Sequence, residues 1–166
     1  MYQPYPASGQ GPVMPPQGPP PQQISNAVKL MYAGAALSAI EIIIGLATIG
    51  SLRSAIKSQY PSYTESQIHT AEVAGIVVAV VIGALAIGLW LWMAWANGKG
   101  KSWARIVATV LFAFNTIDLV TLIGRPHSAV SLIFALLVWL AGLGAIFFLY
   151  QRDSSAYYQA NSGRQR

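Results

Sequence analysis

Four long apolar stretches dominate this sequence of 166 residues and restrict its fold more than any other feature. They cover residues 28–51, 73–96, 104–124 and 128–150. Each has roughly the 20 residues that an α-helix needs to cross a bilayer core of about 30 Å. We therefore predict an all-α membrane protein with four transmembrane helices.

The connections between the stretches define the expected topology. Residues 97–102 and 125–127 form turns that are too short for a crossover, so the helices that they join must be antiparallel. We predict an up-down-up-down four-helix transmembrane bundle over residues 28–151. A head of residues 1–27 precedes it, and a polar tail of residues 152–166 follows it.

The composition agrees with a membrane protein and excludes several kinds of site. Hydrophobic residues make up 54% of the chain and charged residues only 9%, whereas about a quarter of the residues of a soluble domain are charged. The chain has no cysteine, which excludes disulfides, Cys-ligated zinc, iron–sulfur clusters and thiol nucleophiles. We expect no cofactor, and we interpret the net charge of +5 as a sign of membrane topology, with no nucleic-acid partner.

The distribution of Lys and Arg predicts the orientation in the membrane, because cytoplasmic segments carry an excess of both. Seven of the ten cations lie on one side of the predicted bundle: Lys29, Lys99, Lys101, Arg105, Arg152, Arg164 and Arg166. The other side has Arg53, Lys57 and Arg125. We therefore expect a multi-pass plasma-membrane protein with both termini in the cytoplasm.

The head differs in composition from the rest of the chain. Residues 1–23 contain eight prolines and no charged residue, which predicts disorder with polyproline II character up to about residue 27. Residues 12–15 and 16–19 both have the P-x-x-P spacing that groove-binding modules recognise. The head is therefore either a solvated tail or a docking peptide for a cytoplasmic protein.

The loop after the first stretch is expected to extend the helices beyond the membrane. Residues 51–57 continue the helical pattern, and Pro61 would end it. Thr64 and Gln67 have the spacing of a capping box, which predicts an early start for the second long helix.

The same region offers one candidate metal site. Glu65, His69 and Glu72 share one helix face by their i, i+4 and i+7 spacing, and His127 lies in the other outer turn. The four residues could supply nitrogen and oxygen ligands. We favour the alternative, a solvated amphipathic collar, and predict no metal.

Small residues within the stretches predict where helices approach closely. Gly75, Ala79 and Gly83 recur at intervals of four residues in the second stretch. Because lipid gives no hydrophobic drive for association, such stripes let backbones pack closely. They would serve either the bundle itself or a homo-oligomer.

Two acidic residues interrupt the apolar stretches at depth. Glu41 lies twelve residues beyond Lys29, about 18 Å into the membrane. Asp118 lies fourteen residues beyond Ala104, about 21 Å deep on a helix that runs in the same direction. Asn115 is one turn from Asp118 on the same face. These three residues are the predicted intramembrane polar site.

Three interpretations of this site remain open. Neither Lys nor Arg occurs at this depth in the stretches, and low polarity and mutual repulsion disfavour two charged carboxyls, so at least one should hold a proton at neutral pH. The pair could be a structural hydrogen bond, a proton or cation site, or a contact with another membrane subunit. We predict no enzyme, because the motifs of metalloproteases, serine hydrolases and phosphate-binding loops are missing.

Residues 90–107, WLWMAWANGKGKSWARIV, form a short hairpin with cations and indoles at its turn. The hairpin resembles one in small four-span actinobacterial membrane proteins that carry a Pro/Gln-rich head. This resemblance implies the topology and a bacterial source but no activity. From the residues themselves, we predict that Lys99, Lys101 and Arg105 bind anionic headgroups while Trp95 and Trp103 anchor the interface.

A second resemblance concerns the first stretch. Residues 32–41, YAGAALSAIE, followed by Gly45, are similar to the first span of small multidrug-resistance transporters. In that family, a glutamate in the first of four spans exchanges protons for cationic drugs. The resemblance implies that Glu41 is the corresponding carboxylate.

The sequence thus supports two functional hypotheses. We expect a non-enzymatic accessory or scaffold subunit that uses its head to bind a membrane or cytoplasmic protein partner. The alternative is a small proton-coupled transporter built around Glu41 and Asp118.

Overall fold

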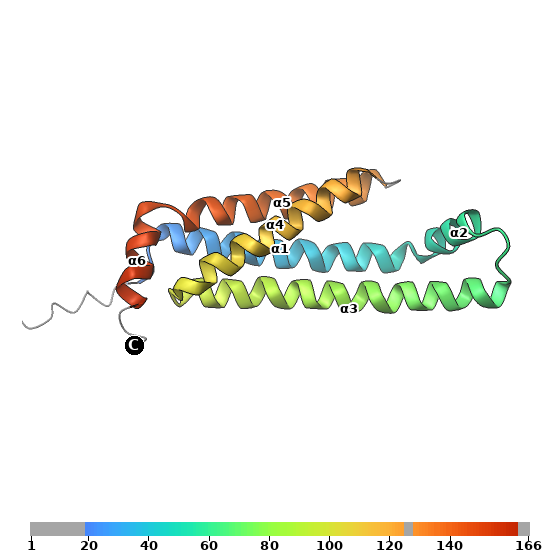
Figure 1. Cartoon of the computed structure of the whole chain (residues 1–166), viewed down its shortest axis with the longest axis horizontal. Helices are drawn as coiled ribbons and strands as arrows, with labels where there is room; N and C mark the ends of the chain where they lie inside the picture. Colours follow the sequence, from blue (N-terminus) through green and yellow to red (C-terminus); the bar gives the residue numbers. More distant parts are fainter. Residues whose placement is uncertain (1–18, 125–127, 163–166) are drawn as a thin grey trace, which may run out of the picture.

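The computed structural model describes residues 19–124 and 128–162, in which all regular secondary structure is helical (Figure 1). In chain order, the helices are α1 (Gln22–Ala47), α2 (Ile49–Gln59), α3 (Glu65–Gly98), α4 (Ser102–Ile123), α5 (Ala129–Leu149) and α6 (Arg152–Ser162). Four of these helices, α1, α3, α4 and α5, are long and apolar enough to cross a membrane. The predicted helical class and the four candidate spans are confirmed.

Helix α1 begins at Gln22, so the last six residues of the predicted head are helical and the boundary at residue 27 was placed too late. Pro21 directly precedes the helix, and its carbonyl accepts the first helical hydrogen bond, from the Ser25 N–H at 3.1 Å. Ile24 and Ala27 are fully buried. The burial of these two side chains stabilises the first turns of the helix, which the composition of the segment alone had predicted to be disordered.

Residues 51–57 are helical, as predicted, and belong to α2. The first long helix ends at Ala47, however, so the prediction that these residues continue it without a break is wrong. Thr48 interrupts the helix: its N–H is shared between the carbonyls of Ile44 and Gly45, and its hydroxyl donates to the Ile44 carbonyl at 2.9 Å. Back-bonding of this kind favours a bend but does not by itself end a helix, since Thr109 and Thr116 make the same bond within α4. Helix α2 then leaves in a new direction (Figure 1).

Helix α3 starts as the sequence predicts. The Thr64 hydroxyl accepts a hydrogen bond from the Gln67 N–H, and the Gln67 side chain accepts one from the Thr64 N–H at 2.8 Å. This capping box is complete. The helix has 34 residues, which corresponds to about 51 Å, so it is longer than a bilayer core is thick.

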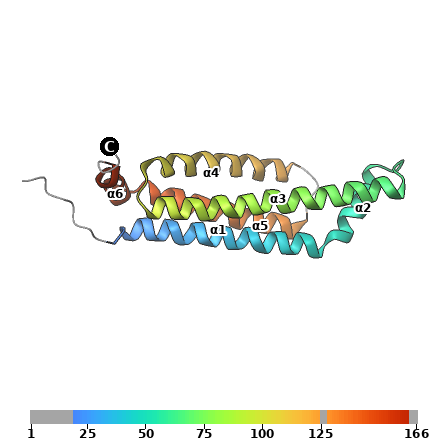
Figure 2. The same ribbon diagram turned by 90° about the horizontal axis from the view of Figure 1, so that it is seen from below.

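The long helices lie side by side along the longest axis of the molecule (Figures 1 and 2). Helix α1 packs mainly against α3 and α5, whereas α4 packs mainly against α5 and less against α3. The start of α1, the end of α3, the start of α4 and the end of α5 all lie at the end of the molecule that carries α6 (Figure 1). We call this end the α6 end.

Glycines mark several close contacts between helices. A Cβ on Gly34 of α1 would lie 2.8 Å from the Trp90 ring of α3, and one on Gly83 of α3 would overlap the Ile42 side chain of α1. The predicted stripe of Gly75, Ala79 and Gly83 therefore does not face a single neighbouring helix. Gly83 meets α1, and a Cβ on Gly75 would lie 3.6 Å from a methyl group of Leu52 in α2. Ala79 is exposed.

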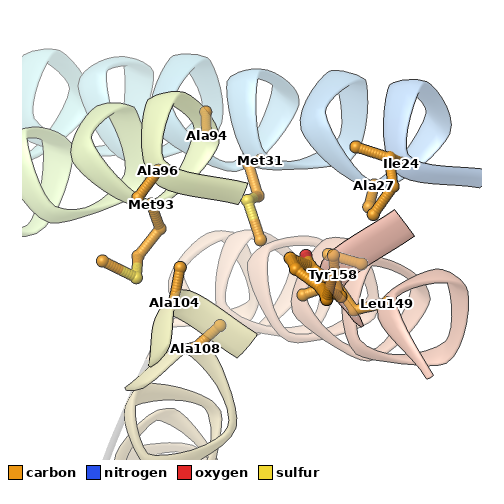
Figure 3. Close-up of a cluster of buried hydrophobic side chains, with 11 residues drawn as sticks. Ile24, Ala27, Met31, Met93, Ala94, Ala96, Ala104, Ala108, Leu149 and Tyr158 are labelled. Carbon is orange, nitrogen blue, oxygen red and sulfur yellow. The ribbon is translucent and has the colours of Figure 1, made fainter. Parts of the chain in front are cut away.

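The buried core gathers toward the α6 end. It contains these side chains (Figure 3): Ile24, Ala27, Met31, Met93, Ala94, Ala96, Ala104, Ala108, Ala145, Leu149 and Tyr158. The rest of the long helices exposes large apolar side chains outward, including Val77, Leu85 and Ile117. This distribution fits helices whose outer surfaces face hydrocarbon.

Candidate functional site

The predicted intramembrane residues come together at one cavity. A space of about 340 Å³ lies between α1, α4 and α5. Its polar lining consists of Glu41, Asn115, Asp118, Thr121 and Ser131. The rise of the helix alone had predicted similar depths for the two acids, and the structure brings them from separate helices to the same space.

Neither acid is neutralised by a neighbour within residues 19–124 and 128–162. Glu41 and Asp118 are both exposed to the cavity or the bundle surface, and no hydrogen bond or salt bridge joins either of them to a described residue. Asn115 lines the same space and is half-buried. The structural hydrogen bond considered above is therefore not formed, while the groups could bind a proton or a cation.

A second cavity, of about 280 Å³, shares Asn115 and Asp118 with the first. It lies between α1, α3, α4 and α5 and is mostly apolar. Its lining includes Trp90, Phe112 and Phe114. Asp118 thus stands between a polar and an apolar space.

The α6 end forms a second candidate site, which sequence reasoning did not predict. The Tyr158 hydroxyl donates to Asn97 Oδ1 at 2.7 Å, and Asn97 Nδ2 donates to the Met93 carbonyl at 2.8 Å. Tyr158 is 1% exposed and Asn97 0%. This chain of bonds fixes α6 to the end of α3. Burial raises the pKa of the Tyr158 hydroxyl.

Further contacts hold α6 against the turn between α3 and α4. Tyr157 donates to the Gly98 carbonyl at 3.1 Å, and Ser102 donates to the Tyr158 carbonyl at 3.3 Å. Gly100 has φ +66°, which favours glycine, and a Cβ there would lie 2.7 Å from the Tyr157 ring. Helix α1 joins the same assembly, because Gln23 donates to Asp153 at 2.7 Å.

The predicted headgroup residues occupy two different environments. Arg105 donates to Ser155 at 3.2 Å, and its guanidinium lies over the Tyr150 and Tyr158 rings at 5.2 and 5.4 Å. Lys99 is exposed. Lys101 lies over the Trp95 ring at 4.6 Å and the Trp103 ring at 6.0 Å.

One sequence signal could have predicted the docking of α6. Ser154 and Tyr158 are four residues apart and share one face of a helix. Both are fully buried. The face was overlooked because the mean composition of residues 152–166 is polar.

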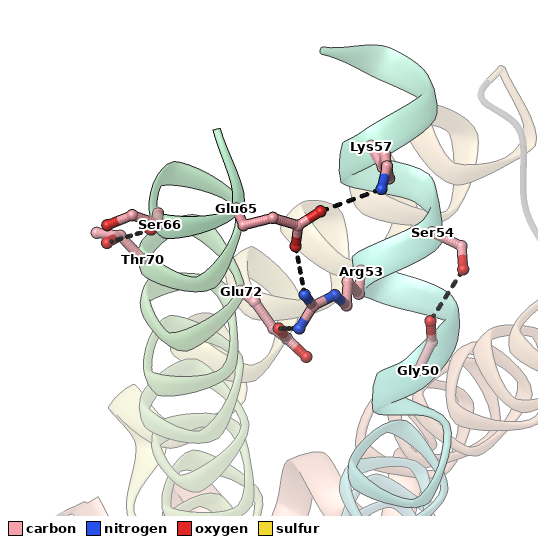
Figure 4. Close-up of polar contacts among 8 residues, drawn as sticks. All are labelled: Gly50, Arg53, Ser54, Lys57, Glu65, Ser66, Thr70 and Glu72. Atoms are coloured by element: carbon pink, nitrogen blue, oxygen red, sulfur yellow. Dashed lines mark hydrogen bonds and ion pairs between the residues drawn. The ribbon is translucent and has the colours of Figure 1, made fainter. Parts of the chain in front are cut away.

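The predicted collar is an ion-paired contact between α2 and α3 (Figure 4). Glu65 pairs with Arg53 at 2.6 Å and with Lys57 at 3.1 Å, and Arg53 also lies 3.8 Å from Glu72. Hydrogen bonds from Lys57 and then Arg53 hold the pKa of the Glu65 carboxyl below its usual value.

The candidate metal site does not assemble in the described part of the chain. Within residues 19–124 and 128–162, no three His, Cys, Asp or Glu side chains lie close enough together to hold a metal ion. Its fourth proposed ligand, His127, lies outside the described residues.

Comparison of the chain with protein-family models, curated proteins and solved structures finds no match.

Proposed function

We propose that the chain is a multi-pass protein of a bacterial plasma membrane, with α1, α3, α4 and α5 as spans in up-down-up-down order and both termini in the cytoplasm. The outward apolar surfaces of these helices support insertion. The excess of Lys and Arg toward the α6 end supports the orientation.

The orientation can be tested with single cysteines, because the chain has none of its own. Ala156→Cys places a thiol on the exposed face of α6, and Ser62→Cys places one in the exposed loop between α2 and α3. In intact cells, a membrane-impermeant thiol reagent should label the cysteine at position 62 but label the one at position 156 only after permeabilisation. The opposite pattern would reverse the topology.

Within this topology, the protein acts as a non-enzymatic accessory or scaffold subunit. The observation that carries this proposal is the buried bond from Tyr158 to Asn97, which fixes α6 as part of the α6 end. An isolated helix of 11 residues is marginal in water, so its docking creates a defined surface. Helix α1 starts at the same end (Figure 1).

Affinity purification from native membranes in mild detergent tests the scaffold role. A deletion should remove only residues 1–18, because Gln22 belongs to α1 and Gln23 bonds to Asp153. A matched control replaces residues 1–18 with a Gly/Ser segment of equal length. We expect a stoichiometric partner with the full chain and its loss in both variants. If all three forms purify alone, the scaffold role is contradicted.

A second candidate function is proton-coupled transport, and one observation favours it: Glu41 and Asp118 line the same cavity with no cationic partner among the described residues. Glu41→Gln should abolish substrate-driven proton movement in liposomes. Asp153→Asn is a matched control, since Asp153 lies on α6, outside the spans. Equal activity of the two variants would exclude Glu41 as the coupling residue.

A further inference from the structure

The turn between α3 and α4 presents a cation surrounded by indole rings. Lys101 lies over Trp95 and Trp103, and the ring centroids of Trp92 and Trp103 are 5.4 Å apart. Since Trp92 belongs to α3 and Trp103 to α4, the two rings bridge the helices. All three indoles are exposed. This bridge is on the bundle surface near the α6 end.

The cations of this turn are available to an outside anion. No salt bridge joins Lys99 or Lys101 to a carboxylate of residues 19–124 or 128–162. Arg105 differs from them, because it donates a hydrogen bond within the described chain, to Ser155. The N–H donors of the two lysines therefore remain available to an outside anion.

An apolar groove begins next to the indole bridge. The cavity of about 280 Å³ includes Leu89, one turn from Trp92 along α3, and Leu111, two turns from Trp103 along α4. Leu89 and Phe114 line it and are exposed, so the cavity opens at the bundle surface between α3 and α4. The polar residues Asn115 and Asp118 lie at its far end.

We propose that one anionic phospholipid of the cytoplasmic leaflet binds here, with its phosphate at Lys99 and Lys101 and one acyl chain in the groove. Charge complementarity selects an anionic headgroup. The apolar lining selects a hydrocarbon chain, and the indoles occupy the interfacial depth between the two parts. The inference rests on the proposed membrane topology, whose failure the cysteine labelling would reveal separately.

Native mass spectrometry tests the headgroup half. The full chain is taken from nanodiscs of equimolar phosphatidylglycerol and phosphatidylcholine. We expect it to retain one phosphatidylglycerol, and Lys101→Gln to reduce the preference for that lipid about fivefold. Lys29→Gln is the matched control, because Lys29 is an exposed cation at the same end on α1. Helix α4 tolerates the Lys101 change, since that side chain makes no capping hydrogen bond in the described structure.

The groove half is tested by filling the cavity. Ala86→Phe places a ring at the cavity wall, whereas Ala84→Phe, the matched control, places one on the exposed face of α3. We expect the first variant to lose the bound lipid and the second to keep it. Equal retention by the two variants would overturn the proposal, as would equal headgroup preference in Lys101→Gln and Lys29→Gln.

A measurement on the unaltered chain does not depend on the folding of any variant. Phosphatidylglycerol with a photoreactive acyl chain should label residues 86–93 and 108–114, which contain most of the groove lining. Labelling spread evenly over other exposed apolar segments, such as residues 77–82, would show that lipid only surrounds the bundle and would overturn the proposal.

Discussion

Tyr158→Phe should weaken the docking of α6 on the bundle, because it removes a single buried hydroxyl. The hydroxyl donates to Asn97 Oδ1 at 2.7 Å, and both side chains are almost completely buried. The variant leaves the Asn97 oxygen without its donor in a place that water does not reach. Such an unsatisfied buried group costs about 1–3 kcal/mol.

Tyr157→Phe is a matched control on the same helix. Its hydroxyl donates to the Gly98 carbonyl at 3.1 Å in a partly buried site, where water can replace it. The net loss should then be only about 0.5–1.5 kcal/mol. The contrast between neighbouring tyrosines separates the effect of burial from that of losing any one hydrogen bond.

Amide hydrogen exchange of α6 in nanodiscs measures this difference. If α6 opens locally, 1–3 kcal/mol corresponds to an increase of about 5- to 150-fold in the exchange rate of its amides for Tyr158→Phe. Equal exchange in the two variants, or none above that of the unaltered chain, would refute the argument that the buried bond fixes α6.

Alkaline pH gives a second readout of the same contact. Because burial raises the pKa of Tyr158 in the folded state, its contribution to docking is complete below the ordinary tyrosine pKa of about 10 and is lost as the pH rises above that value. The opening of α6, measured as its amide exchange rate relative to the intrinsic rate at the same pH, should therefore increase above about pH 10 in the unaltered chain. Tyr158→Phe should lack this part of the pH dependence.

Two further predictions concern other contacts. Lys57 and Arg53 hold the pKa of Glu65 below its usual value. The contact of α2 with α3 should therefore be complete above the ordinary carboxyl pKa and weaken as the pH falls below it. Spin-label distances between the two helices should lengthen in acid, and Glu65→Gln should remove that change. Gly34→Ala should lower the free energy of unfolding in detergent by about 1–3 kcal/mol, because its Cβ would overlap the Trp90 indole. Gly45→Ala is the control on the same helix and should not destabilise the protein, because a Cβ there meets open space. Equal melting temperatures of the two variants would contradict this packing argument.

Much of the fold could be predicted from the sequence, because a bilayer restricts the alternatives severely. The backbone of a spanning segment must satisfy its own hydrogen bonds, so length and apolar composition suffice to predict a helix. The capping box at Thr64 is equally local, and it placed the start of α3 correctly. The break at Thr48 was missed because a hydroxyl that bonds back to the helix is common within regular helices as well.

The partners of the buried α6 face could not be predicted, because they are distant in sequence. Tyr158 and Asn97 are 61 residues apart, and neither local composition nor helix propensity encodes their meeting. The two acids Glu41 and Asp118 were easier to place. A fixed rise per residue predicts that they lie at similar positions along the bundle, but their hydrogen bonding depends on helix rotation, which only packing determines.

The two candidate sites lie in parts of the molecule that are packed differently, and this bears on how the protein could work. At the α6 end, small side chains such as Ala96 and Ala104 let the helices approach, and buried polar groups such as Asn97 are hydrogen-bonded. Around Glu41 and Asp118, the helices enclose a cavity, and the second cavity extends from Asp118 to Met31 and Met93 of the core. Local opening requires least free energy where few contacts are broken. If a proton or cation binds at the acids, as the transport proposal requires, we expect the structural response at this cavity and not at the buried bond from Tyr158 to Asn97.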